Sequence, residues 1–516
     1  MGTPIRVSVP TELPDAHDDR LVRSATALVI SNATGALLGI AFWAVAARLF
    51  PAKDVGNGVA EIAAMVLLAN IAQVNLGIVF PRYLHSAGAQ APRLVRLGYL
   101  TSIVLSLVVG TIFLVIPVHH AYIAGGSSAE LFFVIAVALW VVFGIQDAAL
   151  TGLRKTFWVP VENTSFSIAK IALLPVFLVV APHDGVFLSW VLPVIACIVP
   201  VSCFLFVKVL PGHVSWAAGR GSLPTRQAVG SVLVGEYVGG SAYIALQTIP
   251  ALLVHARLGV VQTAYLQTPW LAGTTFDFLL FNIATSLIVE ASARPRAAPA
   301  IVRRAVRLAM LFLTPGILLI VLGAPTFLRV TLGTQYAHYG TRLLQCLALA
   351  LPFTAVNALY ITFARLARRM RRVAVIQICI TTIFLAETII LIGPMGITGV
   401  GVGFLVGQAA VAIVVAPSVI RQYRRPNMAP GFAPGATLVA QGGPEIGPLL
   451  DGGETVPFDA RHEAGGTADH RVDDLVDDAS DGARSWYVPQ WVPEWRWRGR
   501  AGAARSHAGD DAPREH

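Results

Sequence analysis

Long apolar runs alternate with short polar segments along most of the chain, up to about residue 425. Each run is close to the roughly 20 residues that a helix needs to cross the roughly 30 Å hydrocarbon core of a bilayer. We therefore expect an all-α, polytopic membrane protein with twelve transmembrane helices. The predicted spans lie near residues 24–47, 57–80, 95–117, 130–153, 164–182, 186–209, 229–256, 265–290, 303–325, 341–364, 373–393 and 397–419.

The longer polar connections divide these spans into two groups. A segment at 211–228 separates six spans from six, which predicts two six-helix bundles at 21–210 and 229–425, after a short N-terminal segment at 1–20. The chain from 426 to 516 is poor in apolar residues and rich in Gly, Pro and charge, as disordered tails are. Its one unusual element is rich in Trp and Arg, at 486–498, and suits docking either on the membrane surface or on a partner protein.

Composition and cysteine usage narrow the class of protein. Hydrophobic residues make up 55% of the chain and charged residues 13%, against about 25% charged residues in soluble domains. These values exclude a water-soluble globular protein. The four cysteines fall inside predicted spans without the spacing of a metal or disulfide framework, so we predict no metal site and no cofactor.

The basic residues of the short loops predict the orientation in the membrane, because cytoplasmic loops carry the excess of Lys and Arg. With the N-terminus in the cytoplasm, most loop cations fall on the cytoplasmic side. The exceptions are Arg48, Lys53, Arg257, Arg329 and Arg342. We therefore expect a multi-pass protein of the cell membrane with both termini in the cytoplasm. The basic run at 364–372 then sets topology, and no nucleic-acid partner is expected.

Ionisable and amide side chains inside a membrane are costly and usually face a partner or a wet cavity. Four acids inside the spans, Glu61, Glu236, Asp277 and Glu387, are candidates for binding a coupling proton or sodium ion. Amides inside the spans include Asn357, Gln377 and Gln408.

Helical spacing groups some of these polar positions on two faces. Asn70 and Gln73 share a face of the second span, and Glu236, Tyr243 and Gln247 share a face of the seventh. These faces are candidates for lining a substrate cavity between the halves. Simple hydrogen bonding between helices is the alternative.

Asp147 and Lys170 each lie about seven residues from the predicted loop between the fourth and fifth spans. Antiparallel neighbours would bring the two side chains level, at about 10 Å depth. Two interpretations remain open. The residues form a structural ion pair, or Lys170 meets an anionic head group while Asp147 holds its charge in the resting state.

Several short motifs resemble the polysaccharide flippases of the multidrug/oligosaccharidyl-lipid/polysaccharide exporter superfamily, over about residues 20–425. They are Phe42-Trp43, Ala47-Arg48-Leu49-Phe50-Pro51, Asp54-Val55-Gly56, Asp147 with Thr151-Gly152-Leu153-Arg154-Lys155, Trp158-Val159-Pro160, Asn163 and the segment around Lys170. The resemblance implies an O-antigen flippase-like, alternating-access transporter that carries a polyprenyl-pyrophosphate-linked oligosaccharide to the outer leaflet for cell-envelope polysaccharide synthesis. It implies Lys170, Arg48 and Arg257 as cations for the carrier, and membrane lipids, the lipid-linked glycan and envelope assembly proteins as partners.

Two other functions remain as alternatives. An ion-coupled exporter of drugs or small cations from the same superfamily would use the intramembrane acids. A membrane glycosyltransferase or polymerase is less favoured, because the outer connections are short and carry few acids. We therefore expect a transporter and not an enzyme. The chain also lacks the G-x-x-x-x-G-K-[ST] phosphate loop, so an ion gradient, the membrane potential or downstream consumption of the product would drive transport.

Overall fold

The computed structural model describes most of the predicted membrane domain. It describes the backbone of residues 34–123, 126–217, 221, 223, 226–293, 298–367 and 369–424. Inside these ranges the side chains of 118, 226–236, 278–279, 281–293, 298–312, 366 and 422–424 are not described. All described helices belong to one unit, residues 1–449. The predicted N-terminal segment 1–20 and the tail 426–516, with its element 486–498, lie outside the described residues.

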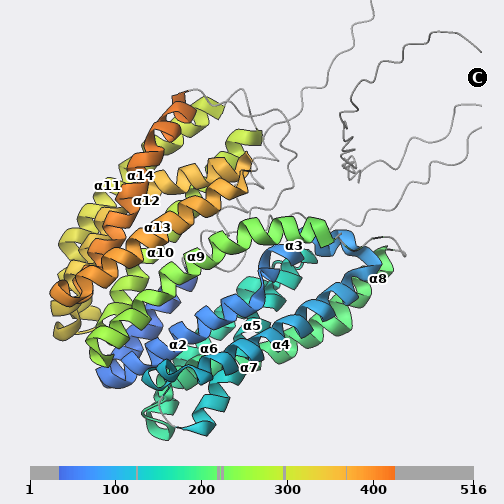
Figure 1. Ribbon diagram of the computed structural model, residues 1–516, viewed down its shortest axis with the longest axis horizontal. Helices are drawn as coiled ribbons and strands as arrows, with labels where there is room; N and C mark the ends of the chain where they lie inside the picture. Colours follow the sequence, from blue (N-terminus) through green and yellow to red (C-terminus); the bar gives the residue numbers. More distant parts are fainter. Residues whose placement is uncertain are drawn as a thin grey trace, which may run out of the picture. The chain divides into compact units, whose positions relative to one another are not determined.

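The first group of helices extends from Thr34 to Ala217 (Figure 1). Its members are Thr34–Leu49, α2 (Ala52–Gln73), α3 (Leu76–Ala87), the 3₁₀ turn η1 (Gly88–Gln90), α4 (Ala91–Val115), the 3₁₀ turn η2 (Pro117–Ala121), α5 (Ser127–Gly152), α6 (Trp158–Val180), α7 (Gly185–Phe204), the π turn η3 (Leu205–Val209) and α8 (Leu210–Ala217). Helix α5 packs against α3, α4 and α7, and α6 packs against α7.

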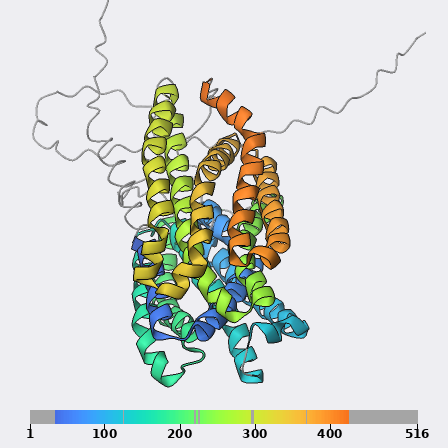
Figure 2. The same ribbon diagram turned by 90° about the vertical axis from the view of Figure 1, so that its left-hand side faces the viewer.

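The second group of helices contains α9 to α14, and Figure 2 shows it lengthwise in green, yellow and orange. Its members are α9 (Arg226–Leu258), α10 (Val260–Ala293), α11 (Ala298–Thr331), α12 (Thr334–Leu366), α13 (Met370–Met395) and α14 (Ile397–Arg424). Helix α12 packs against α10, α11 and α14, while α13 packs against α9 and α14.

Helix length and exposed surface agree with a membrane protein. Ten helical segments of the described chain are long and apolar enough to cross a bilayer. Thr34–Leu49 and α10 correspond to the other two predicted spans. Large apolar side chains are exposed on both groups, including Val179 at 82% and Val414 at 75%, as expected where lipid is the solvent. The predicted all-α fold of two six-helix bundles is confirmed.

The second predicted span is broken where the sequence pattern runs on. Val74 and Asn75 have φ angles of 47° and 58°, in the left-handed region that asparagine tolerates and valine rarely adopts. The break separates α2 from α3.

A glycine lets the end of α5 lie close to α3, since a Cβ on Gly152 would sit 2.5 Å from the carbonyl oxygen of Phe80.

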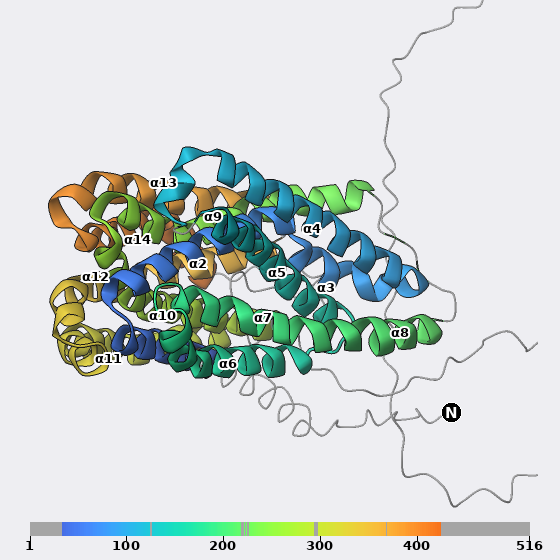
Figure 3. The ribbon, with the colours of Figure 1, turned by 90° about the horizontal axis from the view of Figure 1, so that it is seen from below.

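The two groups of helices meet along α2, which contacts both α9 and α10 (Figure 3). A Cβ on Gly56 at the start of α2 would lie 1.9 Å from the carbonyl oxygen of Val260, so only glycine permits this approach. Several hydrogen bonds join the groups near the same end. Arg48 Nε donates to Thr331 O at 2.9 Å, and His255 Nε2 lies 2.7 Å from Ala121 O.

Candidate functional site

Lys170 lies in α6 inside a cage of aromatic rings. Its side-chain nitrogen is 3.8 Å from the ring centroid of Trp190, 4.8 Å from that of Phe166 and 5.1 Å from that of Phe42. The residue is only 4% exposed, and no ion pair in the described part of the chain includes it. Cation–π attraction to three rings therefore takes the place of a carboxylate partner.

The cage belongs to a larger aromatic cluster built by four helices of the first bundle. Trp43 and Phe42 come from Thr34–Leu49, Trp140 from α5, Phe166 from α6 and Trp190 from α7. The centroid of Trp190 lies 5.2 Å from Phe42 and 6.0 Å from both Trp43 and Trp140. Such contacts add to the burial of the rings, so the wall around the ammonium group is rigid.

The structure does not pair Asp147 with Lys170. Asp147 instead accepts a hydrogen bond from Asn163 Nδ2 at 3.0 Å. Helix α6 begins at Trp158, six residues earlier than the sequence predicts, so Lys170 lies about 18 Å along α6 at 1.5 Å per residue. Asp147 is only about 7.5 Å from the end of α5 at Gly152. The two groups therefore lie at different depths.

A second acid, Glu162, occupies the level of Asp147 on α6 and was missed by the sequence analysis, which placed it in a loop. Gln146 Nε2 donates a hydrogen bond to Glu162 Oε1, and Ser202 Oγ donates to Gln146 Oε1 at 3.1 Å. Asp147 and Glu162 are near enough to interact electrostatically inside the first bundle. Each carboxyl group keeps one buried oxygen to which no described residue donates.

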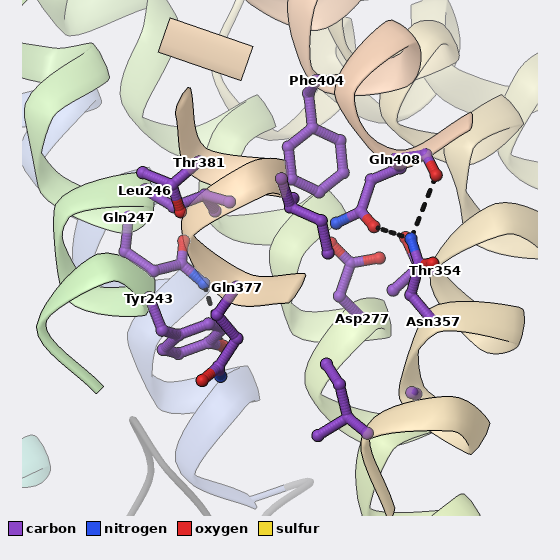
Figure 4. A pocket seen from close by; sticks show the side chains of 13 residues that line it. Tyr243, Leu246, Gln247, Asp277, Thr354, Asn357, Gln377, Thr381, Phe404 and Gln408 are labelled. Carbon is purple, nitrogen blue, oxygen red and sulfur yellow. Dashed lines mark hydrogen bonds between the residues drawn. The ribbon is translucent and has the colours of Figure 1, made fainter. Parts of the chain in front are cut away.

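A cavity of about 80 Å³ with several polar side chains in its wall lies inside the second bundle, and it has room for several water molecules. Figure 4 shows Asp277, Asn357 and Gln408 together on one side and Tyr243, Gln247 and Gln377 on the other. The lining residues come from α9, α10, α12, α13 and α14: Tyr243, Leu246, Gln247, Asp277, Thr354, Asn357, Ala358, Ile361, Gln377, Ile380, Thr381, Phe404 and Gln408.

Hydrogen bonds hold the side-chain amides of Asn357 and Gln247 in this cavity, but one oxygen of its carboxylate, Asp277, has no hydrogen-bond partner among the described residues. Asn357 Nδ2 donates to Gln408 O at 3.0 Å and to Gln408 Oε1 at 2.8 Å. Gln247 Nε2 donates to the hydroxyl oxygen of Tyr243 at 3.1 Å. Asp277 contacts Thr354, but its buried Oδ1 has no partner among the described residues. A proton or a small cation would satisfy that oxygen.

The other predicted site residues are distributed over both bundles. Asn70 and Gln73 are half-buried on α2 and are not among the residues that line this cavity. A second cavity between the halves, lined by the second and seventh spans, stays a prediction. The side chain of Glu236 lies outside the described residues. Glu61 is buried in α2, Glu387 is half-buried on α13, and Arg257 is exposed at the end of α9. Arg48 is exposed, and its guanidinium donates to the carbonyl oxygens of Val330 and Thr331.

No protein-family model matches the chain, and no curated protein matches it. Solved structures do. One, an inward-facing conformation of a multidrug resistance MATE family transporter of the MOP superfamily, has a TM-score of 0.56 and 14% identity, covering 77% of this chain and 96% of that one. An outward-facing conformation of such a transporter has a TM-score of 0.52 and 15% identity, covering 78% and 95%. MATE in complex with MaL6 has a TM-score of 0.50 and 15% identity, covering 78% and 96%.

These likenesses show the fold that the chain shares with MATE transporters. At such identities they do not separate the polysaccharide flippases, which the sequence motifs resemble, from other members of the superfamily. The assignment of substrate therefore depends on the side chains described above.

Proposed function

We propose that this chain is an alternating-access membrane transporter that exports organic cations in exchange for a proton or a sodium ion. The observation that carries the proposal is the polar cavity of the second bundle, where Asp277 presents a buried oxygen without a partner. A buried carboxylate is unstable unless it is protonated or paired. Binding and release of a small cation would give the bundle two states of different energy, which coupled transport needs.

The contacts between the bundles support alternating access. Arg48 with Thr331 and His255 with Ala121 join the bundles at the end that carries the few loop cations expected outside. Tyr237 also donates a hydrogen bond from its hydroxyl to Ile71 O at 3.1 Å, near the other end of α2. The Arg48 and His255 contacts close the arrangement on the side expected to be outside. Both contacts use backbone carbonyl oxygens as acceptors, which water can replace at little cost when the bundles rock apart.

The distribution of charge favours a cationic substrate over an anionic one. Asp147 and Glu162 form an acidic pair inside the first bundle. The amine expected to bind an anion, Lys170, is enclosed by rings and 4% exposed. Arg48 already donates to backbone carbonyls. Asp147 and Glu162 are as buried as Lys170, so the preference for a cation depends on Asp277, the one charged residue among the described residues that line the cavity.

A lipid-linked oligosaccharide flippase of the cell envelope is the second candidate. The motifs around Phe42-Trp43 and Lys170 favour it, because the cation–π cage stores an ammonium group that could meet a pyrophosphate if α6 and α7 separated. Under this alternative the Lys170 side chain must leave the cage during transport. The partners would then be the carrier lipid and its glycan.

Transport by purified protein in proteoliposomes tests the proposal. We expect a proton or sodium gradient to drive movement of ethidium, an organic cation, and Asp277→Asn to slow it about tenfold or more, since tenfold needs only about 1.4 kcal/mol of lost interaction. Asp184→Asn makes the same chemical change at an exposed acid outside the cavity and serves as the matched control. Undiminished transport by Asp277→Asn would refute the coupling role. Absence of ethidium transport together with translocation of a polyprenyl-pyrophosphate oligosaccharide would favour the flippase.

A further inference from the structure

The connection between α4 and α5 brings two histidines and a glutamate together. His119 and His120 are neighbours in η2, and Glu130 lies in the first turn of α5. One ligand atom from each of the three residues lies within 4.8 Å of the other two. The sequence analysis predicted no metal site, because it weighed only cysteine spacing and treated this short connection as a loop.

Hydrogen bonding determines which nitrogen of His119 is available. His119 Nδ1 lies 2.9 Å from the carbonyl oxygen of Ile116, and a carbonyl can only accept, so Nδ1 carries the proton. In the neutral ring Nε2 then has a free lone pair. This arrangement, with one ring nitrogen on a backbone carbonyl and the other free, is the one usual for a metal-ligating histidine.

The free nitrogen faces a carboxylate at the separation of two ligands on one metal ion. His119 Nε2 lies 3.2 Å from Glu130 Oε1, and two acceptors at this distance need a positive charge between them. Tetrahedral zinc with ligand distances of about 2.0 to 2.2 Å separates its ligand atoms by about 3.3 to 3.6 Å. A bound ion would therefore require only a small adjustment of His119 and Glu130.

The third ligand can complete the site by a side-chain rotation. His120 is exposed, and its ring centroid lies 3.8 Å from that of His119. Two imidazoles and one carboxylate, with water in the fourth position, suit a divalent transition metal such as Zn²⁺ rather than Mg²⁺ or Ca²⁺, which prefer oxygen ligands.

The same connection contacts the second bundle. His255 Nε2 on α9 lies 2.7 Å from Ala121 O, and the hydroxyl of Tyr122 donates to Leu252 O at 3.4 Å. A metal ion that links η2 to the start of α5 would hold two groups in place against α9. They are the carbonyl oxygen of Ala121 and the hydroxyl of Tyr122, the residue that follows η2. We propose that His119, His120 and Glu130 form a Zn²⁺-type site that stabilises this contact between the bundles and so slows transport.

Calorimetric titration of the tag-free, full-length protein with ZnCl₂ in detergent tests the site. We expect His120→Gln and Glu130→Gln each to weaken Zn²⁺ binding about tenfold or more. Both residues are at least partly exposed, so the variants should fold. His338→Gln changes an exposed histidine elsewhere and should bind as the unaltered protein does, and MgCl₂ should not compete. Equal Zn²⁺ affinity in the unaltered protein and in the His120→Gln/Glu130→Gln double variant would overturn the proposal.

Hydrogen–deuterium exchange tests the consequence of binding, whatever the substrate proves to be. Zn²⁺ should slow amide exchange both in residues 116–123 and in the end of α9 around His255, and the double variant should show neither effect. Slowing confined to residues 116–123 would show a metal site without influence on the contact between the bundles, and would refute that part of the proposal.

Discussion

The aromatic cage predicts that Lys170 itself adds little or nothing to stability. Lys170→Met keeps the length and apolar stem of the side chain and removes the charge. The change abolishes three cation–π contacts, but it also removes the penalty for holding an ammonium group away from water. No carboxylate of the described chain offsets that penalty.

The distances allow the balance to be worked out. The contact with Trp190 at 3.8 Å is worth about 2 kcal/mol when desolvated, and those with Phe166 and Phe42, at 4.8 and 5.1 Å, about 0.5 to 1 kcal/mol each. Their sum of about 3 to 4 kcal/mol is matched or exceeded by the several kcal/mol that burial of an unpaired ion costs. Lys170→Met should therefore range from neutral to about 3 kcal/mol more stable.

A double-mutant cycle with Trp190→Leu separates the terms. Trp190→Leu alone should destabilise by about 3 kcal/mol or more, from lost packing and the lost cation–π contact. In the Lys170→Met background only packing is lost, so the coupling energy should be about 1 to 2 kcal/mol. Thermal unfolding in one detergent measures all four proteins, with Lys155→Met, an exposed lysine, as control. Destabilisation of more than about 2 kcal/mol by Lys170→Met, or no coupling with Trp190, would refute the reasoning.

Two further predictions concern packing and the acidic pair. Gly152→Ala should destabilise by about 1 to 3 kcal/mol in thermal unfolding, because the added Cβ would lie 2.5 Å from Phe80 O. Gly212→Ala is the control and should not destabilise, because nothing lies within 4 Å of a Cβ at that position. Equal effects of the two changes would contradict the account of the α3–α5 contact. Glu162→Gln should stabilise by about 1 kcal/mol, because an amide can donate to the unpartnered oxygen of Asp147; a fall in the unfolding temperature would contradict it.

Much of the fold could be predicted from the sequence because bilayer thickness sets helix length. The break at Val74 and Asn75 could not, since the apolar pattern resumes directly after Asn75 and packing decides the backbone there. Helix ends were the larger problem. The early start of α6 at Trp158 placed Glu162, not Lys170, opposite Asp147.

The sequence predicted which polar residues could belong to a site, but it did not predict which of them lie together in the folded chain. Tyr243, Gln247 and Asp277 stood out as polar positions in apolar spans, and the structure places all three on one cavity. Which helices meet there depends on contacts far apart in the sequence, such as those of α12 with α14. His119 and Glu130 were missed because helix periodicity does not describe a 3₁₀ turn beside a helix start.

The polar content of α6 also bears on how the chain enters the membrane. A charged residue near the centre of a transmembrane helix raises the free energy of insertion by about 2.5 to 3.5 kcal/mol, and α6 carries both Glu162 and Lys170. Its partners are supplied by helices made before and after it, Gln146 on α5 and Trp190 on α7. We therefore expect stable insertion of α6 to wait for synthesis of α7, so that the α5–α7 segment enters the bilayer as one cooperative unit.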